Sequence, residues 1–132
     1  MTVGEYRLSL QSTSRIRKVQ VENVSSTAGS PIVFVLTTLG ADADAAAFAR
    51  TLVEEKLAAC VSVLPPMISV YRWQGTIEEA REQQLVIKTT AGRVAALQER
   101  FRALHPYDLP EFVVMKPEEV SPLYRDWVVD SV

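Results

Sequence analysis

Hydrophobic residues change their spacing in a regular order from residue 31 onward. The apolar run 32–36 is continuous and rich in β-branched residues, which is typical of a strand buried on both faces. Asp42 is a suitable helix N-cap, and apolar residues at helical spacing follow it from Ala45 to about Lys56. These patterns predict a central strand followed by an amphipathic helix.

Residues 59–73 form a strand-like segment, which Pro65-Pro66 interrupts. Because proline lacks a backbone N–H, we expect the strand to bend at Pro65. Gln74-Gly75 provides a short turn, and residues 76–90 return as a second long strand. The two strands are predicted to form a long hairpin that projects in part beyond its neighbours.

The C-terminal third repeats the order of helix and strand. Apolar residues from Val94 to Leu104 predict a second amphipathic helix that ends before His105-Pro106. Residues 112–115 read as a last strand, and Ser121-Pro122 starts a terminal helix. The whole order predicts an α+β, ferredoxin-like βαββαβ fold with a C-terminal helix and two crossovers over one face of a four-stranded sheet.

A projecting hairpin has a consequence for assembly. It carries Ile68, Val70, Tyr71 and Trp73, so apolar area and strand edges stay exposed unless a second subunit covers them. We therefore expect the protein to self-associate.

The chain divides at Gly29-Ser30-Pro31, after a stretch of small polar residues. Residues 1–30 carry four basic and two acidic residues, whereas the whole chain has a net charge of −2. We interpret 1–30 as an N-terminal extension, either flexible or a marginal β-hairpin; Glu5 and Glu22 argue against a targeting presequence. Residues 31–132 form the predicted domain.

Composition narrows the class of protein. A chain of 132 residues with 48% hydrophobic residues can fill one core. A pI near 5.4 argues against a nucleic-acid partner, and no apolar run approaches the roughly 20 residues of a membrane span. Cys60 is the only cysteine and is expected to be a small buried residue; its isolation fits a reducing compartment, so we expect a cytoplasmic protein.

Five motifs occur in order along the predicted domain. They are AAAFARTLVEEKLAACVS from Ala45, SVYRWQGTI from Ser69, EQQLVIKTT from Glu82, HPYDLPE from His105 and YRDW from Tyr124. Together they closely resemble the CutA divalent-ion tolerance family over about residues 32–129. The resemblance implies a homotrimer of ferredoxin-like subunits, similar in shape to the PII signal-transduction proteins, and a role in divalent-cation or copper tolerance.

Few residues are suited to bind a metal. His105 is the only histidine, and either it is a ligand or it is a satisfied polar group at a helix end. The resemblance implies soft ligands at two further positions, where this chain has Thr37 and Leu104. We predict a weak site for Cu(II) or another divalent cation that involves His105, Thr37 and Glu111 and is not required for folding.

A second set of residues is predicted to line an intersubunit cleft or interface. The aromatic members suit packing or a ligand platform, and the charged ones suit ion pairs or a charged site. The set comprises Tyr71, Trp73, Glu82, Lys88, Tyr107, Asp108 and Trp127.

Standard catalytic motifs are missing: the sequence has no Walker A loop, dinucleotide fingerprint, HExxH or CxxC. We therefore predict a protein that is not an enzyme. Three functions stay open: a metal-binding tolerance trimer, a PII-like sensor of a small anion that uses Lys88 or Arg72, and a scaffold for an unknown protein partner.

Overall fold

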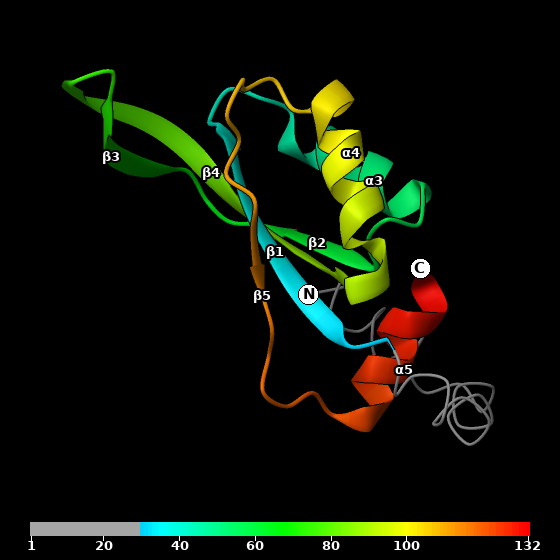
Figure 1. Cartoon of the computed structure of the whole chain (residues 1–132). Helices are drawn as coiled ribbons and strands as arrows, with labels where there is room; N and C mark the ends of the chain where they lie inside the picture. The colour runs from blue at the N-terminus through cyan, green and yellow to red at the C-terminus, as the bar shows by residue number, and fades with distance from the viewer. Residues whose placement is uncertain (1–29) are drawn as a thin grey trace.

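The computed structural model describes residues 30–132, and the hairpin predicted within residues 1–30 lies outside this range. The fold is α+β, with helices packed on an antiparallel sheet (Figure 1). The strands are β1 (Ile32–Gly40), β2 (Cys60–Val63), β3 (Met67–Trp73), β4 (Thr76–Thr90) and β5 (Val113–Met115). The helices are α3 (Ala45–Glu54), the 3-10 turn η1 (Ala91–Arg93), α4 (Val94–Leu104) and α5 (Pro122–Ser131).

The order of the strands is β2-β4-β1-β5, and β3 pairs with β4. The helix α3 joins β1 to β2 with β4 between them, and α4 leads from β4 to β5 with β1 between them. Both β1 and β4 are central, and they pair from Ile32 with Thr90 to Gly40 with Glu82. The α+β class and the long hairpin are confirmed.

The main core lies between the sheet and α3 and α4, which cover the same face (Figure 1). Alternate residues of β1 point into it, because successive side chains of a strand face opposite sides. A second cluster packs α5 against the other side of β1 near Ile32. The main core comprises Val33, Val35, Leu39, Ala45, Phe48, Leu52, Leu57, Ala58, Leu85, Ile87, Leu97 and Phe101.

The limits of α3 correct two sequence predictions. Asp44, not Asp42, caps the helix, since its carboxylate accepts a 3.0 Å hydrogen bond from the Ala47 N–H. The helix ends at Glu54, two residues before the predicted end. Lys56 has a φ of 60°, and Leu57 N–H donates to Leu52 O at 2.9 Å, which together form a Schellman termination that sequence spacing alone does not show.

The segment 59–73 was expected to be one strand bent at Pro65, but the two prolines divide it into β2 and β3, so the sheet has five strands rather than the predicted four. Both then pair with the single long strand β4, so the β3–β4 hairpin projects from the body (Figure 1). Gln74 and Gly75 form the turn with φ values of 50° and 82°, the left-handed conformations that a two-residue hairpin turn requires. No helix within residues 30–132 is long and apolar enough to span a membrane.

Candidate functional site

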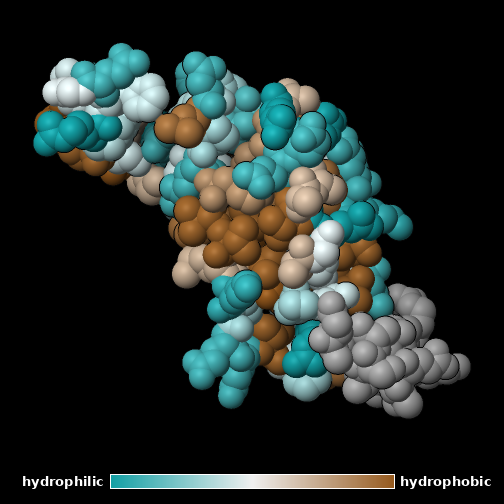
Figure 2. All heavy atoms as spheres, in the orientation of Figure 1, coloured by the Kyte–Doolittle hydropathy of each residue, from teal (hydrophilic) through white to brown (hydrophobic). Residues whose placement is uncertain are grey.

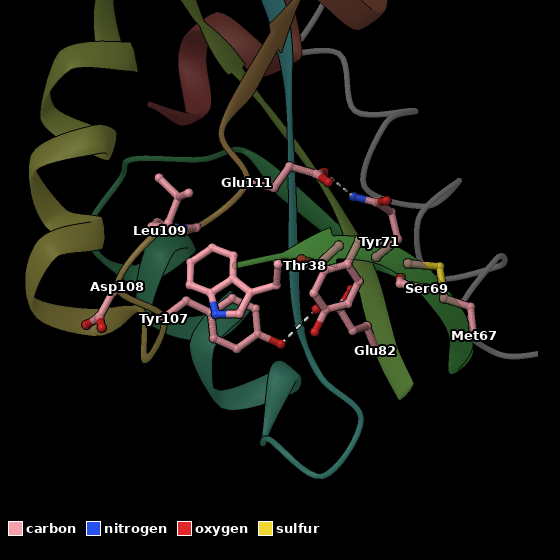
Figure 3. A pocket seen from close by; sticks show the side chains of 12 residues that line it. Thr38, Met67, Ser69, Tyr71, Glu82, Tyr107, Asp108, Leu109 and Glu111 are labelled. Carbon is pink, nitrogen blue, oxygen red and sulfur yellow. Dashed lines mark hydrogen bonds between the residues drawn. The ribbon is translucent and has the colours of Figure 1, made fainter. Parts of the chain in front are cut away.

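A cleft of about 650 Å³ lies at the base of the projecting hairpin (Figure 3). It is on the face of the sheet opposite α3 and α4, because its lining residues on β1 and β4 alternate with core residues. Residues 107–111, which follow α4, form the opposite wall. The lining residues are Thr38, Met67, Ser69, Tyr71, Trp73, Glu82, Gln84, Tyr107, Asp108, Leu109, Pro110 and Glu111.

The strand β3 supplies every second residue to this cleft. Met67, Ser69, Tyr71 and Trp73 line it, as the two-residue period of a strand requires. The apolar residues between them point to the other face of the hairpin and are exposed. The hairpin therefore presents a mixed aromatic and polar face to the cleft.

Tyr107 and Glu82 connect the two walls. The hydroxyl of Tyr107 donates a 2.8 Å hydrogen bond to Oε2 of Glu82, whose residue is only 9% exposed (Figure 3). Burial and this carboxylate raise the pKa of Tyr107 to about 12. The phenol is therefore a persistent hydrogen-bond donor at neutral pH.

Gln84 holds the second carboxylate. Its side-chain amide donates to the carbonyl oxygen of Thr37 at 2.7 Å and to Oε2 of Glu111 at 2.9 Å. One amide group thus orients Glu111 relative to β1. A carboxylate has about four acceptor positions, so a single donor leaves capacity for a ligand on both Glu82 and Glu111.

The ring of His105 packs against that of Tyr107, and both of its nitrogens take part in hydrogen bonds. Nε2 donates to the carbonyl oxygen of Thr38 at 2.8 Å, and Nδ1 accepts from the Tyr107 N–H at 3.1 Å. The ring packs beside Phe48 and Phe101. Burial lowers the pKa of His105, against an opposing effect of the Thr38 hydrogen bond. The residue is also the C-cap of α4, so the satisfied polar group at a helix end is the arrangement present.

The charge of the cleft has one sign. Glu82, Asp108 and Glu111 line it, and no lysine, arginine or histidine is among its lining residues in the described part of the chain. In Figure 3 the carboxylate of Asp108 points away from those of Glu82 and Glu111, so Asp108 contributes at the rim. The electrostatic field of the cleft therefore favours cations.

The structure brings together six of the ten predicted site residues as lining of the cleft. They are Tyr71, Trp73, Glu82, Tyr107, Asp108 and Glu111. His105 supports the cleft through its contacts with Thr38 and Tyr107 but does not line it.

The other three predicted site residues lie elsewhere. Thr37 is fully buried on the helix-covered side of β1. Lys88 donates to Ser62 Oγ at 3.2 Å, and it is about 20 Å from Glu82 along β4 at roughly 3.3 Å per residue. Trp127 packs with Tyr124 and Val128 in the cluster under α5.

The charged site residues were expected either in ion pairs across the sheet or interface or in a charged site. Within the subunit, Glu82, Lys88 and Glu111 have the neutral partners Tyr107, Ser62 and Gln84, and Glu82, Asp108 and Glu111 line the acidic cleft. The ion pairs within residues 30–132 join Arg100 to Glu55 and Arg102 to Glu99. Cys60 is half-buried rather than buried, because it opens β2 and the strand alternation turns it away from the core residue Ala59.

Sequence reasoning missed several lining residues: Thr38, Met67, Ser69, Gln84, Leu109 and Pro110. The alternation of β3 could have identified Met67 and Ser69, since they share a face with Tyr71 and Trp73. Gln84 shares a face with Glu82 in the same way. Tyr107 and Asp108 were predicted in the same cleft as Tyr71 and Trp73, but no spacing in the sequence indicates that Leu109 and Pro110 complete this wall.

The donor groups fit a divalent cation only as a weakly held ligand. Within residues 30–132, no three His, Cys, Asp or Glu side chains are close enough together to hold a metal ion. His105 could coordinate only by giving up one of its two hydrogen bonds. The available donors are the carboxylate oxygens of the cleft, which suit hard cations that retain water ligands.

The fold and the cleft together define a small α+β protein with an acidic cleft suited to cations. The sequence profile of the CutA1 divalent ion tolerance protein family matches residues 33–131. The chain therefore belongs to this family, which confirms the resemblance seen in the five motifs.

Individual relatives agree with this assignment. The divalent-cation tolerance protein CutA of Thermus thermophilus is 45% identical over 97 residues, which cover 74% of this chain and 94% of that protein. The CutA homolog of Xenopus laevis is 48% identical over 84 residues, which cover 64% of this chain and 56% of that protein. The structure of CutA from Synechococcus elongatus has a TM-score of 0.72 and 44% identity, and the match covers 76% of this chain and 88% of that one.

Proposed function

We propose that the protein acts in divalent-cation tolerance by binding the cation weakly in the acidic cleft of a homotrimer. One observation carries this proposal: the cleft is lined by three carboxylates and by no basic residue of the described chain. A cation gains from this field, and an anion is repelled by it. The role is binding and not catalysis.

The position of the basic residues disfavours the alternative of a sensor for a small anion. Lys88 bonds to Ser62 and is about 20 Å away along β4, at roughly 3.3 Å per residue. Arg72 lies between two cleft-lining residues of β3 and so faces the opposite side of the hairpin. Within one subunit, neither cation is placed to neutralise a ligand in this cleft.

The trimer is supported by apolar surface that a single subunit leaves uncovered. Ile68, Val70 and Ile77 on the hairpin are 62%, 63% and 57% exposed. Figure 2 shows a further apolar patch in the middle of the molecule, where Figure 1 places the edge strand β5. All three residues of β5 are exposed. Uncovered strand edges with apolar side chains favour pairing with another subunit.

The proposed cation is Cu(II) or another divalent ion, and the proposed site of action is the cytoplasm. Carboxylate ligands without a thiolate and with a hydrogen-bonded imidazole select poorly among divalent ions. We therefore expect weak binding of several metals rather than tight binding of one. We expect the subunit to fold without the metal, because hydrogen bonds between its own residues already join the walls of the cleft.

Calorimetric titration of the assembled protein with Cu(II), Zn(II) and Mn(II) tests the proposal. We expect saturable, weak binding that Glu111→Gln reduces by about tenfold. Glu118→Gln is the matched control, because Glu118 is an exposed carboxylate outside the cleft. Binding that is unchanged in Glu111→Gln but lost in His105→Ala would place the metal at the imidazole and overturn the proposed site.

A further inference from the structure

The cleft is larger than a metal ion needs. Its volume of about 650 Å³ falls within the range of about 300–1,000 Å³ typical of small-molecule sites. A divalent ion with its ligand shell fills a small part of such a space. The remaining volume is bordered by side chains that a metal does not use.

Those side chains are aromatic. Tyr71 and Trp73 come from β3 and are 43% and 44% exposed, and Tyr107 comes from the opposite wall. Figure 3 shows the ring of Tyr71 beside the carboxylate of Glu82, with Tyr107 across from it. An aromatic face attracts a cation through its quadrupole, most strongly for indole and for cations that shed water easily.

Carboxylates and aromatic rings together select one class of ligand. A divalent metal ion binds the carboxylates but gains little from an indole, which offers it no lone pair. A neutral aromatic ligand gains from the rings but leaves the negative charge of Glu82 and Glu111 uncompensated. An organic ammonium ion uses both, since its charge meets the carboxylates and its alkyl groups meet the rings.

We propose that this cleft binds a small organic ammonium ion, held by the carboxylates of Glu82 and Glu111 and by the aromatic side chains of Tyr71 and Trp73. The inference rests on the proposed function of the cleft as a cation site and names a second class of cation for it. Ammonium and metal ions then compete, because they share the carboxylates but not the rings.

Choline and its uncharged isostere 3,3-dimethyl-1-butanol are the probes for the test. The two molecules have nearly the same shape and differ in the positive charge. We expect choline to bind the assembled protein in a calorimetric titration and to weaken Zn(II) binding in competition, and the isostere to do neither. Equal binding of both probes, or of neither, would overturn the inference.

Variants of Trp73 separate the two classes of cation. Trp73→Leu removes the π face, and we expect about fivefold weaker choline binding with Zn(II) binding unchanged. Trp73→Phe restores an aromatic face and should recover most of the affinity, and the mass of each assembly shows whether the subunits still associate. Choline binding that is equal in both variants contradicts the inference.

The failure of the ammonium site can be distinguished from the failure of the metal site. Loss of Zn(II) binding in Glu111→Gln with no choline binding in any protein leaves the proposed metal function standing and overturns only the ammonium site. If neither cation binds the unaltered protein, both proposals are wrong.

Discussion

The hydroxyl of Tyr107 donates a 2.8 Å hydrogen bond to Glu82, 25 residues away in the sequence. This contact fastens the segment after α4 to the longest strand of the sheet. It also gives the buried carboxylate of Glu82 a hydrogen-bond donor. Without this donor, the carboxylate would lose its hydration on folding and have no hydrogen bond to replace it.

Tyr107→Phe is therefore expected to lower the free energy of unfolding by about 1–3 kcal/mol, because Glu82 loses its partner. Urea denaturation measures the change. Tyr71→Phe is the matched control, since Tyr71 is exposed and lines the same cleft, and we expect it to stay within about 0.5 kcal/mol of the unaltered protein. Equal destabilisation by both variants would mean that the Glu82 contact contributes no stability.

The same phenol predicts a dependence of stability on alkaline pH. The pKa of Tyr107 is raised from 10.0 to about 12 by burial and by Glu82. The unfolded chain thus releases the proton first, so the stabilisation is complete below pH 10 and declines as the pH rises from 10 towards 12. Denaturation curves across this interval should show a steeper decline for the unaltered protein than for Tyr107→Phe. Parallel curves would contradict the raised pKa.

The pKa of His105 is expected to lie below the ordinary histidine value of about 6.5, because burial lowers it. A proton on Nδ1 would also face the Tyr107 N–H, which already occupies that atom. Since the folded pKa is lowered, its contribution to stability is present above about pH 6.5 and is lost as the pH falls. The single imidazole gives one histidine signal in NMR. A titration midpoint at or above 6.5 would show that the ring is not desolvated.

Thr37 and Thr89 form a matched pair for a test of core hydrogen bonding. Both are fully buried, but Thr89 Oγ1 donates to Leu57 O at 2.8 Å, whereas Thr37 Oγ1 has no hydrogen-bond partner within the described structure. Thr37→Val should raise the free energy of unfolding by about 1 kcal/mol, and Thr89→Val should lower it by a similar amount. Chemical denaturation of both variants provides the measurement. The same sign in both would contradict this assignment. Reduced metal binding in Thr37→Val would instead support the predicted ligand role of Thr37.

Charge on the outer face of the hairpin should disrupt the proposed trimer. Val70→Asp places a carboxylate on the apolar face that is 63% exposed in one subunit, and burial of that charge between subunits is costly. Light scattering after size exclusion should show a smaller assembly. Val53→Asp, on an exposed position of α3, should leave the mass unchanged. An unaltered mass for Val70→Asp would exclude this face from the interface.

Local patterns in the sequence were sufficient to predict most elements. The apolar run of β1, the proline break before β3 and the Gln74-Gly75 turn act through neighbouring residues, so their outcome could be read from short stretches. The cap of α3 was misplaced by two residues because Asp42 and Asp44 offer the same chemistry. Backbone geometry, which the sequence does not state, decides between them.

The candidate site was only partly predictable, because contacts between distant segments define it. Glu82 and Tyr107 are both predicted site residues, but the sequence does not indicate their hydrogen bond, and it leaves Glu82 open between an ion pair and a charged site. His105 could be interpreted from the sequence as a metal ligand or as a satisfied polar group at a helix end. These two interpretations differ in whether its ring nitrogens have hydrogen-bond partners within the protein. Gln84 was missed because a glutamine in a strand carries no signal until both of its partners are located.

The strand β4 runs without interruption from the hairpin tip to the core, and this continuity restricts which insertions and deletions the protein tolerates. Glu82 and Gln84 face the cleft while Leu85 and Ile87 face the core, separated by an odd step along the same strand. One inserted or deleted residue between these two pairs would move one pair to the opposite face of the sheet. A carboxylate would then lie in the core, or a leucine in the cleft. Substitutions can therefore accumulate along β4, but changes of length within it cannot.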